Sequence, residues 1–459
     1  MFYQLLILYY LLAIVLTSPL KLDIEVHRRD EIILPHPYLR KRDEFRVPVS
    51  SEYSVYTTIL RIGSNRDPVR VILDTGSSDL WVMSSNVSCV SNEQSKEQKT
   101  GFFDSILTAL NLKATRVCTD NGAFDYLNSA TFTRNDTNPF SIGYIDGVTT
   151  KGFWGYDDIT IGGNPISNLS FAVAEETSSK IGVLGIGLPE AVSTNTKYDK
   201  SYENLPLKMK NLGLINRTSY SVYMNSNEAR YGAILFGAID HAKYSGNLTT
   251  LDIVNPPSSL QRLRIPISSI QIANGTNSPT TAVSKGPSAL LDTGCTYSRF
   301  SKDVVDSIAK QVGATFSKDK NQYIIDCNIP ATTLLRLNFN GQPIDIPMTE
   351  MIRSAGTNTC TLGIDVDESN SLSIVGDNIL RRMYVYFDLE GKQISVAQAV
   401  YTDEQNIEII SDDNFQTDGQ EAGSELVQEE EKNTSSASNI LFSWSFLISA
   451  LSVFFIYNI

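Results

Sequence analysis

Two stretches of the chain decide its fold: residues 71–78 read VILDTGSS and residues 289–296 read ALLDTGCT. In both, three apolar residues lead into an Asp-Thr-Gly triplet, and the two triplets stand 218 positions apart. Each copy is followed downstream by two apolar residues and a glycine, at 183–185 and at 374–376. One such triplet is a weak signal that occurs in many turns. Two copies with matching surroundings indicate an internal duplication with one acid in each half.

Short runs rich in β-branched and aromatic residues surround the triplets and alternate with Gly, Asn and Pro. This pattern is typical of strands, and it predicts strands at 56–62, 69–73, 220–223 and 233–236. The clearest helical periodicity covers residues 303–312. With 459 residues, of which 42% are hydrophobic, the chain is long enough for two or three domains with buried cores. We therefore expect a mostly β molecule with short helices.

The composition argues against several classes of partner and enzyme. The net charge of −13 argues against nucleic acid as the main partner. The chain has only three histidines, His27, His36 and His241, and two of them lie near the N-terminus. This argues against a Ser-His-Asp hydrolase, an HExxH metalloprotease and a multi-histidine metal site. If the chain is a hydrolase, its acid–base chemistry must come from carboxylates, and we expect no metal and no cofactor.

The N-terminal region reads as a targeting and processing segment. Residues 4–16 are apolar, which predicts a cleaved secretory signal at 1–18, with a signal anchor as the alternative. Residues 19–42 are expected to be a propeptide that ends at the pair Lys41 and Arg42. A kexin-like processing protease would cut after Arg42 and leave Asp43 as the new N-terminus. The alternative is an incidental dibasic pair on a turn.

The C-terminal region reads as a stalk followed by an anchor signal. Residues 403–432 contain eleven acidic residues and one lysine, so we expect 403–433 to be a disordered, self-repelling stalk. Residues 440–459 are mostly apolar and uncharged, and small residues precede them at 433–438. This order predicts a removed GPI-anchor signal at 434–459 with lipid attachment at Asn433. A tail-anchored transmembrane helix is the alternative.

Seven Asn-X-Ser/Thr sequons support a glycosylated secretory protein of a fungus or another eukaryote. Six lie in the body of the chain and are the expected glycosylation sites: Asn86, Asn135, Asn168, Asn216, Asn247 and Asn274. The seventh is Asn433.

On these motifs the chain resembles the pepsin-like aspartic proteases over residues 50–400. Residues 74–82 (DTGSSDLWV) are similar to the first catalytic loop, and residues 141–147 (SIGYIDG) are similar to the flap. Residues 291–294 are similar to the second catalytic loop. Residues 374–377, together with YVYFD at 384–388, are similar to the end of the second lobe. With the dibasic site and the C-terminal signal, the chain is most similar to the yapsins and GPI-anchored candidapepsins of yeasts.

The resemblance implies a bilobal pepsin-like fold. Two pseudo-symmetric β lobes, residues 43–240 and 241–402, would enclose an active-site cleft between them. Asp74 and Asp292 would be the catalytic pair, one from each lobe. Two carboxyl groups about 3 Å apart cannot both ionise, so one proton is shared, as it is in pepsin. On this resemblance, the ionised member takes a proton from water, and the protonated member polarises the scissile carbonyl.

The remaining motif residues take supporting roles on the same resemblance. The hydroxyls of Thr75 and Thr293 would lock the two loops together, and Gly76 and Gly294 would permit tight turns. Ser77 would donate to Asp74. The equivalent position in the second copy is Cys295, where the family usually has Ser or Thr. A thiol is a weaker donor, so the matching bond to Asp292 is in doubt.

The flap carries three further candidates. Tyr144 resembles the tyrosine that closes over substrate, with Trp81 bonding or packing against it, and Gly147 lies in the same turn motif. Asp146 is expected to favour Lys or Arg before the cut bond; a plain hairpin-turn role is the alternative. The resemblance also implies the disulfides Cys89–Cys118 and Cys327–Cys360, which would leave Cys295 as a free thiol.

Three functions compete on the sequence alone. The first is an active, GPI-linked, monomeric endopeptidase at the plasma membrane or cell wall that cuts surface, wall or secreted proteins. The second is a weak or inactive adhesive wall protein on the same scaffold. The third is a processing protease retained along the secretory route. The intact pair Asp74 and Asp292 favours catalysis.

Overall fold

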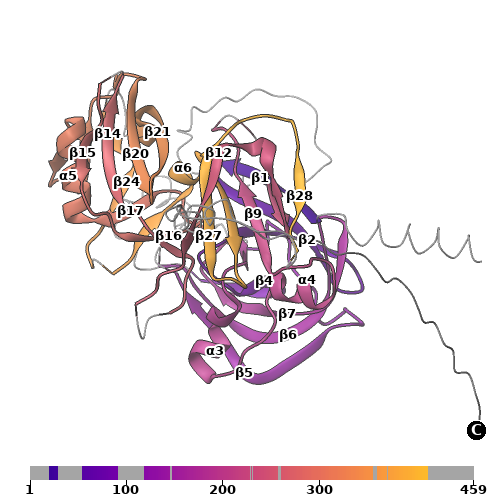
Figure 1. Ribbon diagram of the computed structural model, residues 1–459. Coiled ribbons are helices and arrows are strands. Elements are labelled where there is room, and N and C mark those ends of the chain that lie inside the picture. Colours follow the sequence, from indigo (N-terminus) through magenta and orange to yellow (C-terminus); the bar gives the residue numbers. More distant parts are fainter. Residues whose placement is uncertain are drawn as a thin grey trace, which may run out of the picture. The chain divides into compact units, whose positions relative to one another are not determined.

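The computed structural model describes residues 20–28, 54–90, 118–144, 147–227, 229, 231–256, 260–275, 277–354, 359–369 and 371–411. These residues belong to one unit of the chain, residues 1–419. Strands dominate and form several sheets, shown in Figure 1. The expected mostly β architecture with short helices is confirmed. The strands predicted at 56–62, 69–73, 220–223 and 233–236 are all present.

The largest sheet contains thirteen strands within the described ranges and combines residues from both expected lobes. In sheet order it runs β12 (Tyr244–Asp252), β27 (Gln393–Ala399), β26 (Met383–Asp388), β9 (Ser219–Tyr223), β10 (Tyr231–Phe236), β1 (Leu20–Arg28), β2 (Ser54–Ile62), β3 (Asp67–Asp74), β8 (Gly182–Gly185), β4 (Leu80–Cys89), β7 (Asn164–Thr177), β6 (Thr149–Ile161) and β5 (Thr133–Gly143). β2 also pairs with β6.

Four smaller sheets use residues after position 237. The sheet that leads into the second Asp-Thr-Gly loop has the order β13 (Arg264–Pro266), β16 (Ser288–Leu291), β25 (Ser373–Val375), β17 (Ser298–Ser301) and β24 (Ile364–Asp367). A second has the order β15 (Thr280–Val283), β14 (Ser269–Asn274), β20 (Thr333–Phe339) and β21 (Gln342–Pro347). A third has the order β18 (Thr315–Ser317), β19 (Gln322–Ile325), β23 (Cys360–Leu362) and β22 (Ile352–Ser354). β11 (Ala238–Asp240) pairs with β28 (Ile407–Ile409).

The helices are short, and α5 (Lys302–Val312) matches the predicted helical pattern. It buries Val305, Ile308 and Ala309, which the 3.6-residue period places on one face. Gly313 ends it in the left-handed region at φ 74°, where glycine avoids a steric cost. The other helices are α3 (Ser193–Tyr198), α4 (Leu205–Asn211), α6 (Asp377–Leu380) and the 3-10 turns η2 (Pro189–Ala191), η3 (His241–Lys243) and η4 (Met348–Met351).

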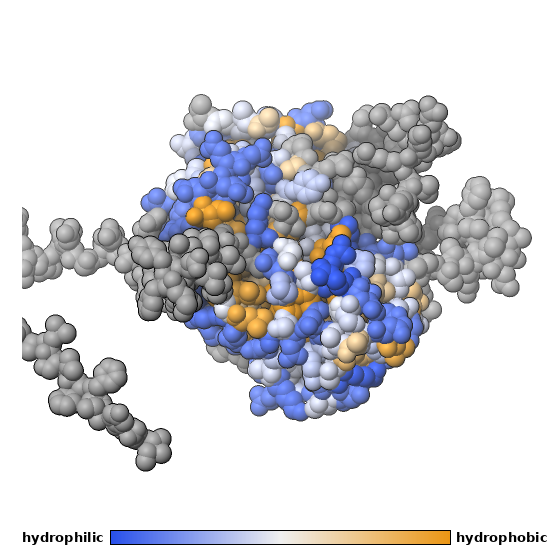
Figure 2. All heavy atoms as spheres, turned by 90° about the vertical axis from the view of Figure 1, so that its right-hand side faces the viewer, coloured by the Kyte–Doolittle hydropathy of each residue, from blue (hydrophilic) through white to orange (hydrophobic). Residues whose placement is uncertain are grey.

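Most buried apolar side chains join one cluster that runs from β2 and β3 to β16, β20 and β26. The large hydrophobic side chains that remain exposed are far apart in the chain, such as Leu127 and Tyr231. On the face shown in Figure 2, hydrophilic residues cover much of the surface and the apolar residues form separate patches. Most large apolar side chains are therefore buried in the core rather than exposed on this face.

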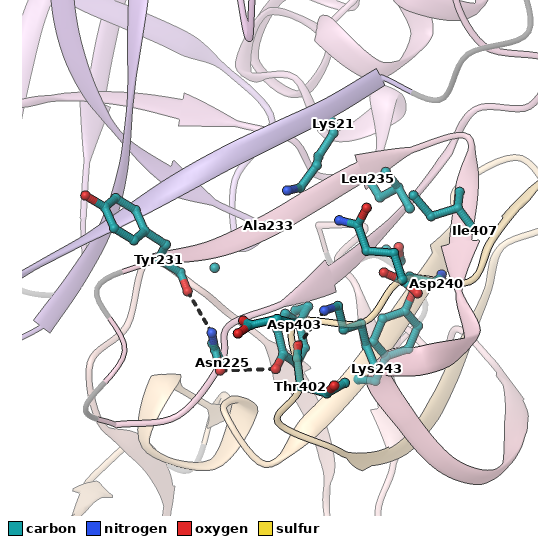
Figure 3. A pocket seen from close by; sticks show the side chains of 15 residues that line it. Lys21, Asn225, Tyr231, Ala233, Leu235, Asp240, Lys243, Thr402, Asp403 and Ile407 are labelled. Atoms are coloured by element: carbon teal, nitrogen blue, oxygen red, sulfur yellow. Dashed lines mark hydrogen bonds between the residues drawn. The ribbon is translucent and has the colours of Figure 1, made fainter.

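β1 comes from the expected propeptide, and it lies in the middle of the largest sheet. It pairs antiparallel with β10 on one side and with β2 on the other. Leu22 and Ile24 are each 1% exposed and belong to the main core cluster. On the other face, Lys21 lines a cavity of about 180 Å³ together with Asp240 and Asp403, shown in Figure 3. Residues 20–28 are thus a structural part of the described fold.

The first residues of the expected stalk also belong to the fold. β28 pairs with β11, and Ile410 is 2% exposed. His241 Nε2 lies 2.7 Å from a carboxylate oxygen of Glu408. Apolar residues within the acidic segment thus pack against the rest of the fold. The prediction that a disordered stalk begins at residue 403 is therefore too early in the chain. Residues 412–459, with Asn433 and the expected anchor signal, lie outside the described residues, as do the expected signal peptide and Arg42.

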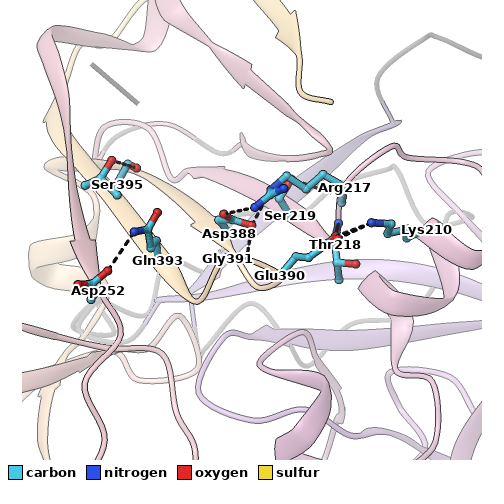
Figure 4. Close-up of polar contacts among 11 residues, drawn as sticks. Lys210, Arg217, Thr218, Ser219, Asp252, Asp388, Glu390, Gly391, Gln393 and Ser395 are labelled. Atoms are coloured by element: carbon cyan, nitrogen blue, oxygen red, sulfur yellow. Dashed lines mark hydrogen bonds and ion pairs between the residues drawn. The ribbon is translucent and has the colours of Figure 1, made fainter. Parts of the chain in front are cut away.

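Polar contacts join α4 and the segment before β9 to the end of β26, as drawn in Figure 4. Arg217 donates from Nε and Nη2 to the two oxygens of Asp388, at 2.8 and 2.7 Å. Asp388 is 1% exposed, so this bidentate pair is shielded from water. Lys210 donates to Glu390 at 2.6 Å. None of the helices in the described ranges combines the length and the apolar character that a membrane span requires.

Candidate active site

The two aspartates lie at the ends of two strands. β3 ends at Asp74 and pairs in parallel with β8, which places Asp74 opposite Gly185. β16 ends one residue before Asp292 and pairs in parallel with β25. The downstream glycines therefore lie on the strands beside the catalytic loops. A Cβ atom at Gly185 would stand 2.6 Å from the Asp79 nitrogen, and one at Gly376 would stand 2.6 Å from the Cys295 oxygen. Only glycine lets these backbones approach so closely.

A reciprocal set of four hydrogen bonds joins the two loops. The Thr75 amide donates to Thr293 Oγ1 at 3.1 Å, and the Thr293 amide donates to Thr75 Oγ1 at 3.0 Å. The Thr75 hydroxyl then donates to the Leu291 carbonyl at 2.7 Å, and the Thr293 hydroxyl donates to the Leu73 carbonyl at 2.8 Å. Both threonines are almost fully buried. This arrangement holds the two Asp-Thr-Gly loops in one fixed relation.

The loop glycines bring the two carboxyl groups together. A Cβ atom at Gly76 would lie 2.5 Å from the carboxyl carbon of Asp292. A Cβ atom at Gly294 would lie 2.8 Å from Asp74 Oδ1. Each glycine therefore faces the aspartate of the other loop, and a side chain at either position would push the acids apart. Asp74 is 6% exposed and Asp292 is half-buried, so the pair is partly shielded from bulk water.

The two aspartates do not receive the same hydrogen bonds. Asp74 accepts from the Gly76 amide at 2.7 Å and from the Ser77 hydroxyl at 2.5 Å. Asp292 accepts from the Gly294 amide at 2.9 Å. In the described part of the chain, the Cys295 thiol makes no hydrogen bond to it. Donors favour the charged form of a carboxyl, so this difference favours the charge on Asp74.

The electrostatic surroundings also favour a proton on Asp292. Burial, the charge of Asp74 and a hydrogen bond with Asp74 raise the pKa of Asp292 well above its usual range. The Gly294 amide and Arg262 oppose this rise. Burial and the surrounding carboxylates also raise the pKa of the Cys295 thiol, which is therefore neutral. The site can therefore hold one proton on Asp292, as acid–base hydrolysis by a pair of carboxyls requires.

The flap is the hairpin of β5 and β6, and its tyrosine reaches the site. Trp81 Nε1 donates to the Tyr144 hydroxyl at 2.7 Å. Burial and the charge of Asp74 raise the Tyr144 pKa, while bonds with Trp81 and Ser77 lower it. The phenol is therefore next to the catalytic loop. Gly147 has φ 85°, a conformation that suits glycine in the turn. Asp146 lies outside the described residues.

Four nearby residues were not assigned a role from the sequence. Arg262 Nη1 donates to the Gly76 carbonyl at 3.1 Å, although the two residues are 186 positions apart. The Asp377 carboxyl is fully buried, and neither oxygen has a hydrogen-bond partner in the described part of the chain. Asp79, on the first catalytic loop, is buried and accepts from the Tyr202 hydroxyl at 2.6 Å. The motif at 374–377 contains Asp377, but no spacing signal points to Arg262 or Tyr202.

The cysteines pair as the resemblance implied. Disulfides join Cys89 with Cys118 and Cys327 with Cys360, and Cys295 is a free thiol. All six sequon asparagines within the described body are exposed, and they are Asn86, Asn135, Asn168, Asn216, Asn247 and Asn274. Across the described ranges, no three His, Cys, Asp or Glu side chains form a group that could hold a metal ion.

The duplicated Asp-Thr-Gly loops, the threonine lock and the flap define an aspartic endopeptidase. Residues 55–399 match the model of the eukaryotic aspartyl protease family, and the chain belongs to that family. It is 33% identical to Secreted aspartic protease 9 of Candida albicans, over 87% of this chain and 88% of the relative. It is 36% identical to Aspartic proteinase 3 of Saccharomyces cerevisiae, over 81% of this chain and 75% of the relative. The expected similarity to the candidapepsins and yapsins is thereby confirmed.

Proposed function

We propose that the chain is a GPI-anchored surface endopeptidase that works in acid through Asp74 and Asp292. The catalytic part of this proposal rests on one observation. Asp74 and Asp292 lie on two loops that are held together, yet Asp74 accepts more hydrogen bonds than Asp292. Asp74 takes a proton from the attacking water, whose oxygen adds to the scissile carbonyl carbon. Asp292 donates its proton toward the carbonyl oxygen. When the resulting tetrahedral intermediate breaks down, the C–N bond breaks and the leaving nitrogen takes a proton from the aspartate pair. The products are a new carboxyl end and a new amine end.

A peptide assay tests this mechanism. The mature protein is incubated with a peptide library between about pH 2 and pH 8, with and without pepstatin. We expect cleavage with a bell-shaped acidic profile, because only the singly protonated pair is active. Pepstatin should abolish it. An optimum near pH 8 would contradict a shared-proton mechanism, and no cleavage at any pH would favour the adhesive protein as the alternative. The observation that favours this alternative is that the Cys295 thiol makes no hydrogen bond to Asp292 in the described structure.

We further propose that the enzyme accepts Lys or Arg immediately before the cut bond. The support is Asp146, which stands two positions after Tyr144 in the sequence. Tyr144 lies next to Ser77 and Asp74, so a substrate chain on the dyad passes close to the flap. A basic side chain that loses water there needs a partner, and a carboxylate in a low-dielectric site is an effective one.

Matched peptides with Lys or Leu before the cut bond test this preference. The ratio of kcat/KM values should favour Lys in the wild type, and Asp146→Thr should reduce it by about tenfold. The preference should also weaken as the pH falls and the carboxylate is protonated. A ratio that changes by less than about twofold would remove Asp146 from specificity.

The remaining proposals concern location and processing. The signal at 1–18, the acidic segment and the apolar end support attachment to the plasma membrane or cell wall through Asn433. A kexin-like protease would cut after Arg42, although the structured propeptide strand β1 lies upstream of that cut. The substrates would be surface, wall or secreted proteins, and the enzyme would act as a monomer. Release of the protein from cells by a phosphatidylinositol-specific phospholipase would support the anchor.

A further inference from the structure

A second polar cavity is lined by residues from the C-terminal half of the chain. Its volume is about 420 Å³. It is lined by Arg264 on β13, by Ser288 at the start of β16 and by Ser373 at the start of β25. Residues 254–256 close another side. The dyad mechanism uses none of these side chains.

Arg264 is half-buried and offers an unpaired donor at Nε. Its Nε atom is buried and has no hydrogen-bond partner, and no carboxylate pairs with the guanidinium in the part of the chain that the structure describes. Burial and the like charge of Arg262 lower the pKa of Arg264. Buried or half-buried arginines usually have a carboxylate or phosphate partner, because the unpaired charge is costly. Here the protein itself supplies no partner among the described residues.

The other lining groups suit an anion. The hydroxyls of Ser288 and Ser373 make no side-chain hydrogen bond within the described residues, so both can donate to a ligand. None of the cavity-lining residues is acidic. Asn255 holds the edge in place, because it donates to the Arg262 carbonyl and accepts from the Arg262 amide, both at 3.0 Å. One guanidinium and two free hydroxyls form a donor set that matches a small oxyanion.

The segments that line the cavity continue toward the two Asp-Thr-Gly loops. Ser288 precedes Asp292 by four positions along an extended strand, which corresponds to about 13 Å. Arg262, two positions before Arg264, donates to the catalytic-loop carbonyl of Gly76.

We propose that the cavity around Arg264, Ser288 and Ser373 is an oxyanion-binding site. Its ligand is a small oxyanion, a carboxylate or a phosphate-like ion, and both offer the same acceptor oxygens. Binding of a free ion does not depend on the proposed proteolytic function. Binding of a substrate carboxylate rests on it.

Titration calorimetry with inorganic phosphate tests the site itself. Phosphate is added to the full-length secreted protein at fixed ionic strength, with chloride as the reference salt. Arg264→Gln should weaken phosphate binding by at least about tenfold, the usual effect of losing a charge-assisted bond. Arg61→Gln removes an exposed arginine elsewhere and should change binding by less than about twofold. Ser288→Ala combined with Ser373→Ala keeps the arginine and should weaken binding by about fivefold.

Two results would overturn the site. The first is wild-type protein that binds phosphate no better than chloride, and the second is Arg264→Gln that binds as well as wild type. If Arg264→Gln does not fold, the double serine variant decides in the same way. Failure of proteolysis would leave these measurements unaffected.

Peptides identify the source of the oxyanion. Matched substrates carry Glu or Gln four residues from the cut bond, on either side of it. If a substrate carboxylate is the ligand, one Glu peptide should have a kcat/KM value at least about fivefold higher, and Arg264→Gln should abolish this ratio. Equal rates for all peptides, with phosphate binding intact, assign the site to a free ion.

Discussion

The two aspartates occupy equivalent positions in a repeat, yet a single residue makes their surroundings unequal. Ser77 gives Asp74 a second donor, and Cys295 gives Asp292 none in the described structure. A hydroxyl on a carboxylate stabilises the charged form, so its absence keeps the proton on Asp292. The duplication alone would produce two similar acids. In the proposed mechanism, this serine-to-cysteine difference makes Asp74 the base and Asp292 the acid.

Replacement of the thiol tests this assignment. Cys295→Thr offers Asp292 a hydroxyl donor, so kcat/KM should be preserved or rise by up to about tenfold. The same donor lowers the pKa of Asp292, so the high-pH limb of the rate profile should move to lower pH. Rates across the pH range measure both effects. A loss of activity greater than about tenfold in a folded Cys295→Thr protein would mean that the thiol has a positive role.

At the scale of elements, the flap depends on a bond between strands that are far apart in the sequence. Trp81 on β4 holds the Tyr144 hydroxyl at the end of β5. Trp154 on β6 lies in the same apolar cluster, but its Nε1 atom has no partner in the described structure. The two indoles are thus chemically alike and differ in whether they hold the tyrosine.

Replacement of each indole separates these roles. Trp81→Phe should lower kcat/KM by about tenfold, because Tyr144 loses its donor and closes less firmly over substrate. Trp154→Phe removes an unpaired N–H and should change kcat/KM by less than about threefold. Equal effects of the two substitutions on kcat/KM would show that packing, rather than the hydrogen bond, positions the flap.

The strands around the triplets could be predicted, because β-branched residues alternate with turn residues there. The dyad, the lock and the flap tyrosine followed from local motifs and the family resemblance. β1 and β28 were missed, because both lie in segments whose composition suggested processing or disorder. Arg262 was missed because its contact with Gly76 depends on chain folding over 186 positions. Sequence motifs report local chemistry, whereas these contacts come from tertiary packing.

For the whole molecule, buried carboxyls make stability depend on pH. Burial raises the pKa values of Asp79, Asp292 and Asp377. These groups bind protons more tightly when folded than when unfolded, so their stabilisation is lost as the pH rises above about 4. The bond to Lys302 lowers the pKa of Asp306, whose stabilisation is lost as the pH falls below about 4. Because the raised carboxyls are the more deeply buried, the protein should be most stable in acid.

Thermal unfolding between about pH 4 and pH 7 measures this dependence. Tm should fall as the pH rises over this range, and Asp377→Asn should flatten the slope, because asparagine stays neutral at every pH. Asp319→Asn, at an exposed position, should leave the slope unchanged. A wild-type Tm that rises steadily toward pH 7, or an unchanged slope in Asp377→Asn, would contradict the assignment of a neutral buried carboxyl.

The most direct test of the shared-proton dyad is peptide hydrolysis by Asp74→Asn and Asp292→Asn at the acidic optimum. Each amide keeps the shape of the carboxyl but cannot exchange the proton, so each variant should lose at least about 10³-fold in kcat/KM. Thermal unfolding should show that both proteins remain folded. If either folded variant retains more than about a tenth of wild-type kcat/KM, the two carboxyls do not form the catalytic pair.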